Sequence, residues 1–187
     1  MAQVKKPNIK KGSPVKATDY SLHFLAGFFV IAFVYFLVPG NYVLFFQEQQ
    51  SLFLYTGDYI LEFFEKPGSP ADLAARFLTQ FYISSFAGSL ILAAVLSLPA
   101  AILFYVNRRL IPGSGLSGPL AVIPSCLLLI MQTHYYHLML YNIGFVLVIA
   151  FFLIIIIQVN IRNRYIAIAF FPLLFYVAGA FALIFIG

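Results

Sequence analysis

The chain has 187 residues, of which 63% are hydrophobic and 9% charged, and its mean hydropathy is +0.97. Soluble domains carry about 25% charged residues, so this composition excludes an ordinary soluble surface and is typical of a membrane protein. The formal net charge of +5 is attributed to basic residues beside the cytoplasmic leaflet, by the positive-inside rule, and not to nucleic-acid binding.

The first predicted elements are a polar tail and one membrane span. Residues 1–20 contain five lysines, two prolines and a glycine without apolar periodicity, which predicts a disordered basic tail on the cytoplasmic side. Residues 21–39 predict the first span, which the apolar residues 42–46 can extend to the ~20 residues that a bilayer requires. Pro39 and Gly40 are expected to break or kink it. No small-residue cleavage site is present, so no signal peptide is predicted.

The segment 41–81 separates the first two apolar runs and is predicted to be helical. Its apolar positions around Tyr59 and Phe63 recur with helical spacing, and Thr56 or Asp58 could cap that helix. A turn at residues 67–70 follows, with Ser69 as the expected N-cap of a second helix that continues toward the next span. We therefore expect a helical hairpin at the outer membrane surface. Five of the six acidic residues lie in this segment: Glu48, Asp58, Glu62, Glu65 and Asp72.

Four more spans are predicted, at residues 82–106, 117–136, 142–160 and 165–187. The second span has small residues on one face, which permits close contact between helices. These residues are Ser85, Gly88, Ser89, Ala93 and Ser97. The bend at Pro124 in the third span is tolerable if neighbouring helices or Ser125 satisfy the carbonyl that it frees.

The basic residues set the predicted orientation. Nine of the eleven lie in the tail and in two short loops, at residues 108–109 and 162–164. Five spans place all three clusters on one side, whereas four spans would scatter them. By the positive-inside rule the N-terminus is then cytoplasmic, and the segments 41–81 and 132–141 face outward from a bacterial inner membrane. The predicted class is an all-α polytopic membrane protein.

Two carboxylates in the outward segment are candidate catalytic residues, Glu48 and Asp58. A carboxylate at the outer interface could act as a general base, or hold a metal ion, for a lipid-linked substrate. The alternative is that the acidic residues solvate the polar faces of interfacial helices. Glu48 is the stronger candidate, because it lies in a glutamine cluster flanked by aromatic residues close to the membrane, where a charge needs partners.

A second polar cluster occupies residues 132–142, between the third and fourth spans. His134 and His137 share a helical face and could form half of a metal site, but zinc sites need three or four ligands, so no metal site is predicted. The alternative is a belt of aromatic and histidine side chains at the headgroup level. The candidate ligand-binding residues are Gln47, His134, His137 and Tyr141. Without a glycine-rich nucleotide loop, zinc motif or catalytic triad pattern, no cofactor is predicted.

Several motifs in the stretch 47–81 carry a resemblance: Gln47-Glu48-Gln49, Leu52-Phe53, the Pro67-Gly68 turn, and the run from Phe77 to Phe81. The stretch resembles the opening of an uncharacterised family of multi-pass membrane proteins of Gram-negative bacteria. Those proteins are longer, which implies that this chain is a short relative or the N-terminal part of a longer one.

The layout is also similar to the first module of C-type membrane glycosyltransferases, in which one span precedes an outward helical loop with an acidic residue. That class takes sugars from lipid carriers and uses a loop carboxylate as the base. The usual paired acidic motif directly after the first span is absent here, so Glu48 or Asp58 would have to replace it.

Two functions follow from these patterns, and whether the chain is an enzyme stays open. The first is a non-catalytic or fragmentary envelope protein that packs against other membrane subunits in the lipid bilayer. The second is a module of a lipid-linked sugar transferase, or a lipid-handling protein. A transporter is disfavoured, because the spans carry no acidic or basic residue and show no inverted repeat. Convergence of Glu48, His134 and His137 on one polar cavity would favour the enzyme.

Overall fold

The computed structural model describes residues 17–110, 117–158 and 164–185, and within these ranges it contains helices and no strand. The predicted all-α class is therefore confirmed. The α-helices and 3-10 segments (η) are α1 (Ala17–Leu37), α2 (Asn41–Gln50), α3 (Gly57–Glu62), α4 (Ser69–Thr79), η1 (Gln80–Ile83), α5 (Ser85–Leu110), α6 (Ser117–Gln132), α7 (Met139–Gln158), α8 (Arg164–Ala178) and η2 (Gly179–Phe185).

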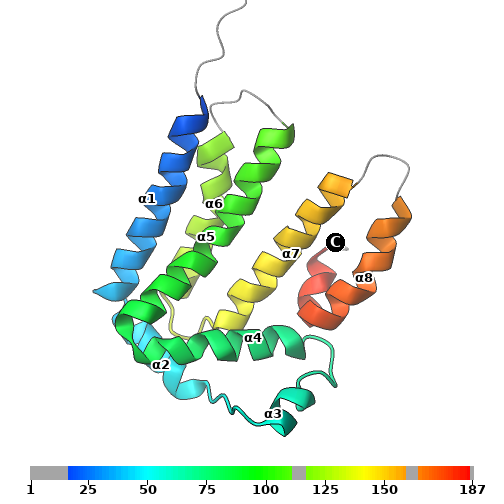
Figure 1. The fold of residues 1–187 in the computed structure, drawn as a ribbon. Coiled ribbons are helices and arrows are strands. Elements are labelled where there is room, and N and C mark those ends of the chain that lie inside the picture. The colour runs from blue at the N-terminus through cyan, green and yellow to red at the C-terminus, as the bar shows by residue number, and fades with distance from the viewer. Residues whose placement is uncertain (1–16, 111–116, 159–163, 186–187) are drawn as a thin grey trace, which may run out of the picture.

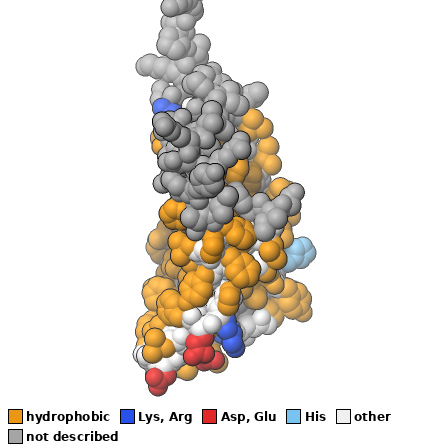
Figure 2. Space-filling model, turned by 90° about the vertical axis from the view of Figure 1, so that its right-hand side faces the viewer, with side chains coloured by type: hydrophobic (Ala, Val, Ile, Leu, Met, Phe, Trp, Pro, Cys, Tyr) orange, Lys and Arg blue, Asp and Glu red, His pale blue; other side chains and the backbone are white. Residues whose placement is uncertain are grey.

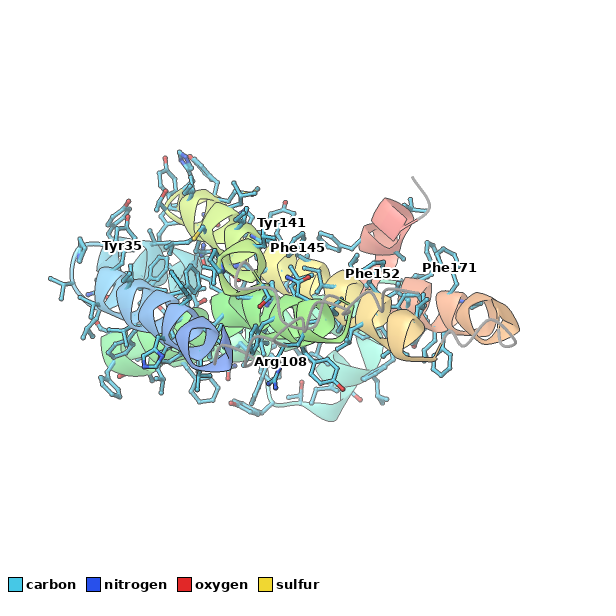
Figure 3. All side chains as sticks on the ribbon, turned by 90° about the horizontal axis from the view of Figure 1, so that it is seen from above. Tyr35, Arg108, Tyr141, Phe145, Phe152 and Phe171 are labelled. Carbon is cyan, nitrogen blue, oxygen red and sulfur yellow. The ribbon has the colours of Figure 1, made fainter. Side chains whose placement is uncertain are left out.

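The helices form an upright layer and a transverse layer. Helices α1, α5, α6, α7 and α8 stand side by side, and α2, α3 and α4 lie at their lower end (Figure 1). The start of α1, the end of α5 and the start of α8 are all at the upper end (Figure 1). Seen from above, α1, α5, α7 and α8 follow one another in a row, and α6 packs beside α1 and α5 (Figure 3). The transverse layer thus closes one end of the row.

Helix α5 is the centre of the upright layer and packs against α1, α6 and α7. The predicted small-residue face supports this packing, because Gly88, Ser89, Ala93 and Ser97 are all buried. A Cβ atom on Gly88 would lie 2.9 Å from the Cα atom of Tyr82. The glycine therefore lets η1 fold closely against the start of α5.

A hydrogen bond between helices compensates for the proline in α5. Pro99 lies inside α5, and the backbone N–H of the next residue, Ala100, donates to Ser125 Oγ on α6 at 3.0 Å. Both partners are buried. Ser125 was expected to serve the bend at Pro124 in its own helix, but this bond serves α5.

The transverse layer differs from the predicted hairpin of two helices. It contains three short helices, and α4 does not run straight into α5, because η1 and an extended Ser84 (φ −98°, ψ 114°) intervene. This break accompanies the burial of Tyr82 in the core. The N-cap of α4 is Gly68 instead of Ser69, with φ +87°, a left-handed conformation that glycine adopts without steric cost.

The predicted helix over residues 165–187 is also interrupted. Helix α8 ends at Ala178, Gly179 takes a φ of +59°, and the chain turns back as η2 beside α7 and α8 (Figure 1). The turn meets the start of α4, where the Gly68 N–H donates to the carbonyl of Tyr176 at 2.9 Å. The ring of Phe181 lies against Gly144 of α7, where a Cβ atom would be only 2.5 Å from it.

Length and composition identify few helices that could cross a membrane alone. Within the described ranges, Ser85–Arg108 is one such helix, and the pair Leu22–Leu37 and Asn41–Gln50 becomes a second if the 72° bend between them lies within one span. The apolar helices Ser117–Gln132, Met139–Ile155 and Phe170–Leu183 are shorter.

Candidate functional site

Four polar residues form a hydrogen-bonded ring where α2 meets the loop between α6 and α7, closed through the main-chain carbonyl of His137. We call Gln47, Gln132, His137 and Asn142 the amide cluster. Gln47 is 2% exposed, Gln132 and Asn142 are 0% exposed, and His137 is half-buried. Buried amides are costly unless they are hydrogen-bonded, so this cluster is the first place to examine for function.

The hydrogen bonds run around the ring. Gln47 Nε2 donates to the carbonyl of His137 at 2.7 Å, and Gln47 Oε1 accepts from Gln132 Nε2 at 3.3 Å. Gln132 Oε1 accepts from Asn142 Nδ2 at 2.6 Å, and Asn142 Oδ1 lies 3.1 Å from His137 Nε2. Since an amide oxygen can only accept, the neutral His137 carries its proton on Nε2. The four groups therefore satisfy one another.

Helix α2 brings Gln47 to this position through one face of the helix. Tyr42 Oη donates to the carbonyl of Thr133 at 3.2 Å, and the rings of Phe46 and Tyr135 lie edge to face with centroids 4.6 Å apart. Positions 42 and 46 are spaced i and i+4, which places them on the same side of a helix, and Gln47 follows Phe46 directly. Docking of this face on the α6–α7 loop turns Gln47 inward.

The predicted catalytic residues lie elsewhere. Glu48 is one residue after Gln47, hence about 100° around the helix, and it lines a separate groove of about 440 Å³. The half-buried Glu48 carboxylate has no hydrogen bond or ion pair with any described residue. Asp58 lies exposed in the first turn of α3. Glu48 and His137 therefore line different grooves.

The predicted ligand-binding residues separate in a similar way. The amide group of Gln47 is hydrogen-bonded within the amide cluster, and His134 is exposed on the loop. His137 and Tyr141 lie together, with ring centroids 5.3 Å apart. Both line a groove of about 540 Å³ between α6, α7 and η2, which we call the apolar groove. Its other lining residues are Pro124, Leu127, Leu128, Met131, Phe145 and Phe181.

His137 connects the amide cluster to the apolar groove. Its partial burial lowers its pKa below the usual histidine value of 6.5; the hydrogen bond to Asn142 opposes this shift, and the nearby His134 adds to it. The ring is therefore held in its neutral form near pH 7. Within the described part of the chain, no group of three or more His, Cys, Asp or Glu side chains could hold a metal ion.

Comparison with known proteins gives one match. A family of unknown function (DUF6057) matches residues 16–187. The chain belongs to this family. The predicted membership of an uncharacterised family is thereby confirmed. No curated protein and no solved structure matches the chain.

In this DUF6057 chain, the amide cluster joins α2 to the end of α6 and the start of α7 by hydrogen bonds. Gln132 is the last residue of α6, and Asn142 lies in the first turn of α7. Sequence reasoning placed both residues in a polar cluster but did not assign them to the site. The sequence did contain a signal for these two residues, because an amide at the edge of an apolar run needs a buried partner. Its partner could not be inferred from spacing.

Proposed function

We propose that this chain is a multi-pass membrane protein that serves as a non-catalytic component of the cell envelope and packs against other membrane subunits. The supporting observation is that large hydrophobic side chains point outward along every upright helix. Water would contact this surface in an isolated soluble chain, at a large free-energy cost. These side chains include Val30, Ile31, Val34, Phe86, Leu90, Leu98, Leu120, Ile123, Leu127, Ile130, Phe152, Ile154, Leu173 and Phe175.

The proposed topology keeps five spans, formed by the five upright helices, with the transverse layer at the outer surface. Hydrophobic side chains cover the middle of the face in Figure 2, and acidic side chains gather at its lower end. Glu62 and Glu65 of the transverse layer are exposed. Arg108 lies in the last turn of α5, which ends at the upper side of the molecule (Figure 1). The positive-inside rule then makes the upper end cytoplasmic.

A non-catalytic role is supported by the separation of the candidate residues. Glu48 and His137 line different grooves, and His134 is exposed. The amides of the cluster bind one another, which leaves them little capacity for a substrate. A transferase module would require Glu48 or Asp58 to act as the base without either histidine.

Cysteine labelling tests the topology. The single cysteine, Cys126, is removed by Cys126→Ala, and Glu62→Cys and Arg108→Cys are made separately in that background. Both replaced side chains are exposed. In spheroplasts treated with an impermeant maleimide, the Glu62→Cys protein should be labelled at once and the Arg108→Cys protein only after permeabilisation. Release of the chain by carbonate washing, or labelling of both sites from outside, would contradict the proposal.

A second candidate function is lipid handling, which the apolar groove supports. Its walls are hydrophobic except for His137 and Tyr141, so it suits an acyl chain. Leu127→Trp should fill the groove and reduce the lipid that co-purifies in mild detergent, as measured by mass spectrometry. Ile130→Trp is the matched control, because Ile130 is exposed on the same helix but does not line the groove. Equal lipid retention by the two variants would count against this function.

A further inference from the structure

We infer that the groove beside Glu48 binds the ammonium group of a membrane amphiphile, such as the headgroup of an aminophospholipid. This rests on the proposed function only for the position of the groove at the membrane surface. We call it the Glu48 groove. Its lining residues are Glu48, Ser51, Leu52, Phe53, Tyr55, Gln80, Phe81 and Ile83.

The charge of the groove selects a cation. Glu48 is the one charged residue among the described residues that line it, and its carboxylate has no partner among them. A partly desolvated carboxylate without a partner is stabilised by an opposite charge. The hydroxyl oxygen of Ser51 is buried and also has no partner within the described residues. Carboxylate and hydroxyl oxygens can both accept hydrogen bonds from an ammonium group, which has only donors.

Aromatic rings in the lining of the groove favour an organic ammonium group as the cation. Three of the lining residues are aromatic, Phe53, Tyr55 and Phe81. The rings of Phe53 and Tyr55 lie edge to face with centroids 5.1 Å apart, and Phe77 lies between Phe53 and Phe81, at 5.7 and 5.6 Å. Ammonium groups are attracted to the faces of aromatic rings, which is how proteins recognise choline-like ligands.

Hydrogen bonds hold the two walls together. Tyr55 Oη donates to Gln80 Oε1 at 2.6 Å, and Gln80 Nε2 donates to the carbonyl of Phe53 at 3.4 Å. These bonds join the segment that follows α2 to η1, on either side of the groove. The walls are therefore positioned before a ligand binds, which reduces the entropic cost of binding.

The rim of the groove indicates an amphiphile and not a small soluble amine. Leu52 and Tyr55 are each 75% exposed, and Ile83 is 71% exposed. These side chains line the same groove as Glu48 and would contact the hydrocarbon part of a ligand whose ammonium group meets its carboxylate. A ligand with both parts is expected to bind more tightly than either part alone.

The test is calorimetric titration of the purified full chain in maltoside micelles. The probes are decylammonium, decanol with the same chain but no charge, and ethylammonium with the charge but no long chain. Decylammonium should bind saturably, and the other two should bind at least about tenfold more weakly. Working in detergent makes the result independent of topology, so failure here and failure of cysteine labelling are distinguishable.

Three variants decide whether Glu48 is responsible. Glu48→Gln keeps the shape and removes the charge, and it should weaken decylammonium binding about tenfold. Tyr55→Leu removes one ring and should weaken it about threefold. Glu62→Gln, an exposed acid on α3 outside the groove, should change nothing.

Three results would overturn the assignment. They are equal binding by the Glu48→Gln protein, decanol binding as tight as decylammonium binding, and an equal loss in the Glu62→Gln protein. Thermal unfolding of each variant checks that it is folded. If Glu48→Gln fails to fold, the comparison of decylammonium with decanol on the unsubstituted chain and on Tyr55→Leu decides the question.

Discussion

Two of the contacts between the transverse layer and the upright helices have opposite chemistry. At the amide cluster, three buried amide side chains of α2, α6 and α7 and the half-buried His137 of the α6–α7 loop are hydrogen-bonded in a ring. At the second contact, Gly68 before α4 meets Gly179 after α8 with no side chains between them. We call this second contact the glycine contact. A Cβ atom on Gly179 would lie 2.8 Å from the Cα atom of Gly68.

The two contacts use different sources of specificity. The amide cluster has specific partners, because each buried donor or acceptor that loses its partner keeps a desolvation cost of about 1–3 kcal/mol. The glycine contact depends on close backbone approach and on left-handed φ angles at both residues. The amide cluster should therefore be sensitive to substitutions that change side-chain polarity, and the glycine contact to substitutions that change side-chain size.

The largest predicted loss of stability comes from disrupting the amide cluster. Gln47→Leu leaves the carbonyl of His137 and Gln132 Nε2 without their partner, and should destabilise the fold by about 2–4 kcal/mol. Thermal unfolding in detergent measures the loss. Gln49→Leu on the same helix is the control, because Gln49 is exposed and should change stability by less than about 0.5 kcal/mol. Equal effects of the two substitutions would show that the cluster contributes no specific stability.

The next effect concerns the glycine contact. Gly179→Ala places a Cβ atom on a left-handed residue, at a cost of about 1–2 kcal/mol, and pushes against the backbone of Gly68. Hydrogen exchange of the Gly68 N–H, which donates to Tyr176, should accelerate. The control is Gly27→Ala on α1, where a Cβ atom meets nothing within 4 Å and should stabilise the helix by about 0.5–1 kcal/mol. Unchanged exchange in the Gly179→Ala protein would contradict this account.

The smallest effect is a pH dependence confined to the amide cluster. Folding lowers the pKa of His137 below the usual value of 6.5, so the unfolded chain takes up a proton first as the pH falls. Stability should be complete above pH 6.5 and decline below it, until the folded-state pKa is passed. Melting temperatures between pH 8 and 5 would follow this decline.

Two controls sharpen the pH prediction. His137→Gln should remove the decline, whereas His134→Gln should keep most of it, because His134 is exposed and only adds to the shift. Hydrogen exchange at Gly68 should not share the pH dependence of the amide cluster. If the His137→Gln protein still loses stability below pH 6.5, another titratable group is responsible for the loss.

Local patterns in the sequence were sufficient for the elements of the fold. The apolar runs and the segment 41–81 were predicted to be helical, and helices fill most of the described residues. Proline and glycine marked the end of α1 and the start of α4, since they act on the backbone within a few residues of their own position, whereas Pro99 and Pro124 lie inside helices. The prediction failed at Gly179, because a glycine inside an apolar run does not by itself reveal that the chain turns there.

By itself the sequence determined an all-helical chain with scarce polar residues that require partners. Only the tertiary structure decided which partners they have. Gln47 and Glu48 are adjacent and both hydrophilic, yet docking of α2 on the α6–α7 loop buries Gln47 and leaves Glu48 lining another groove. The reason is rotational: one residue turns about 100° around a helix. Contacts between residues some 90 positions apart, not local spacing, set that rotation.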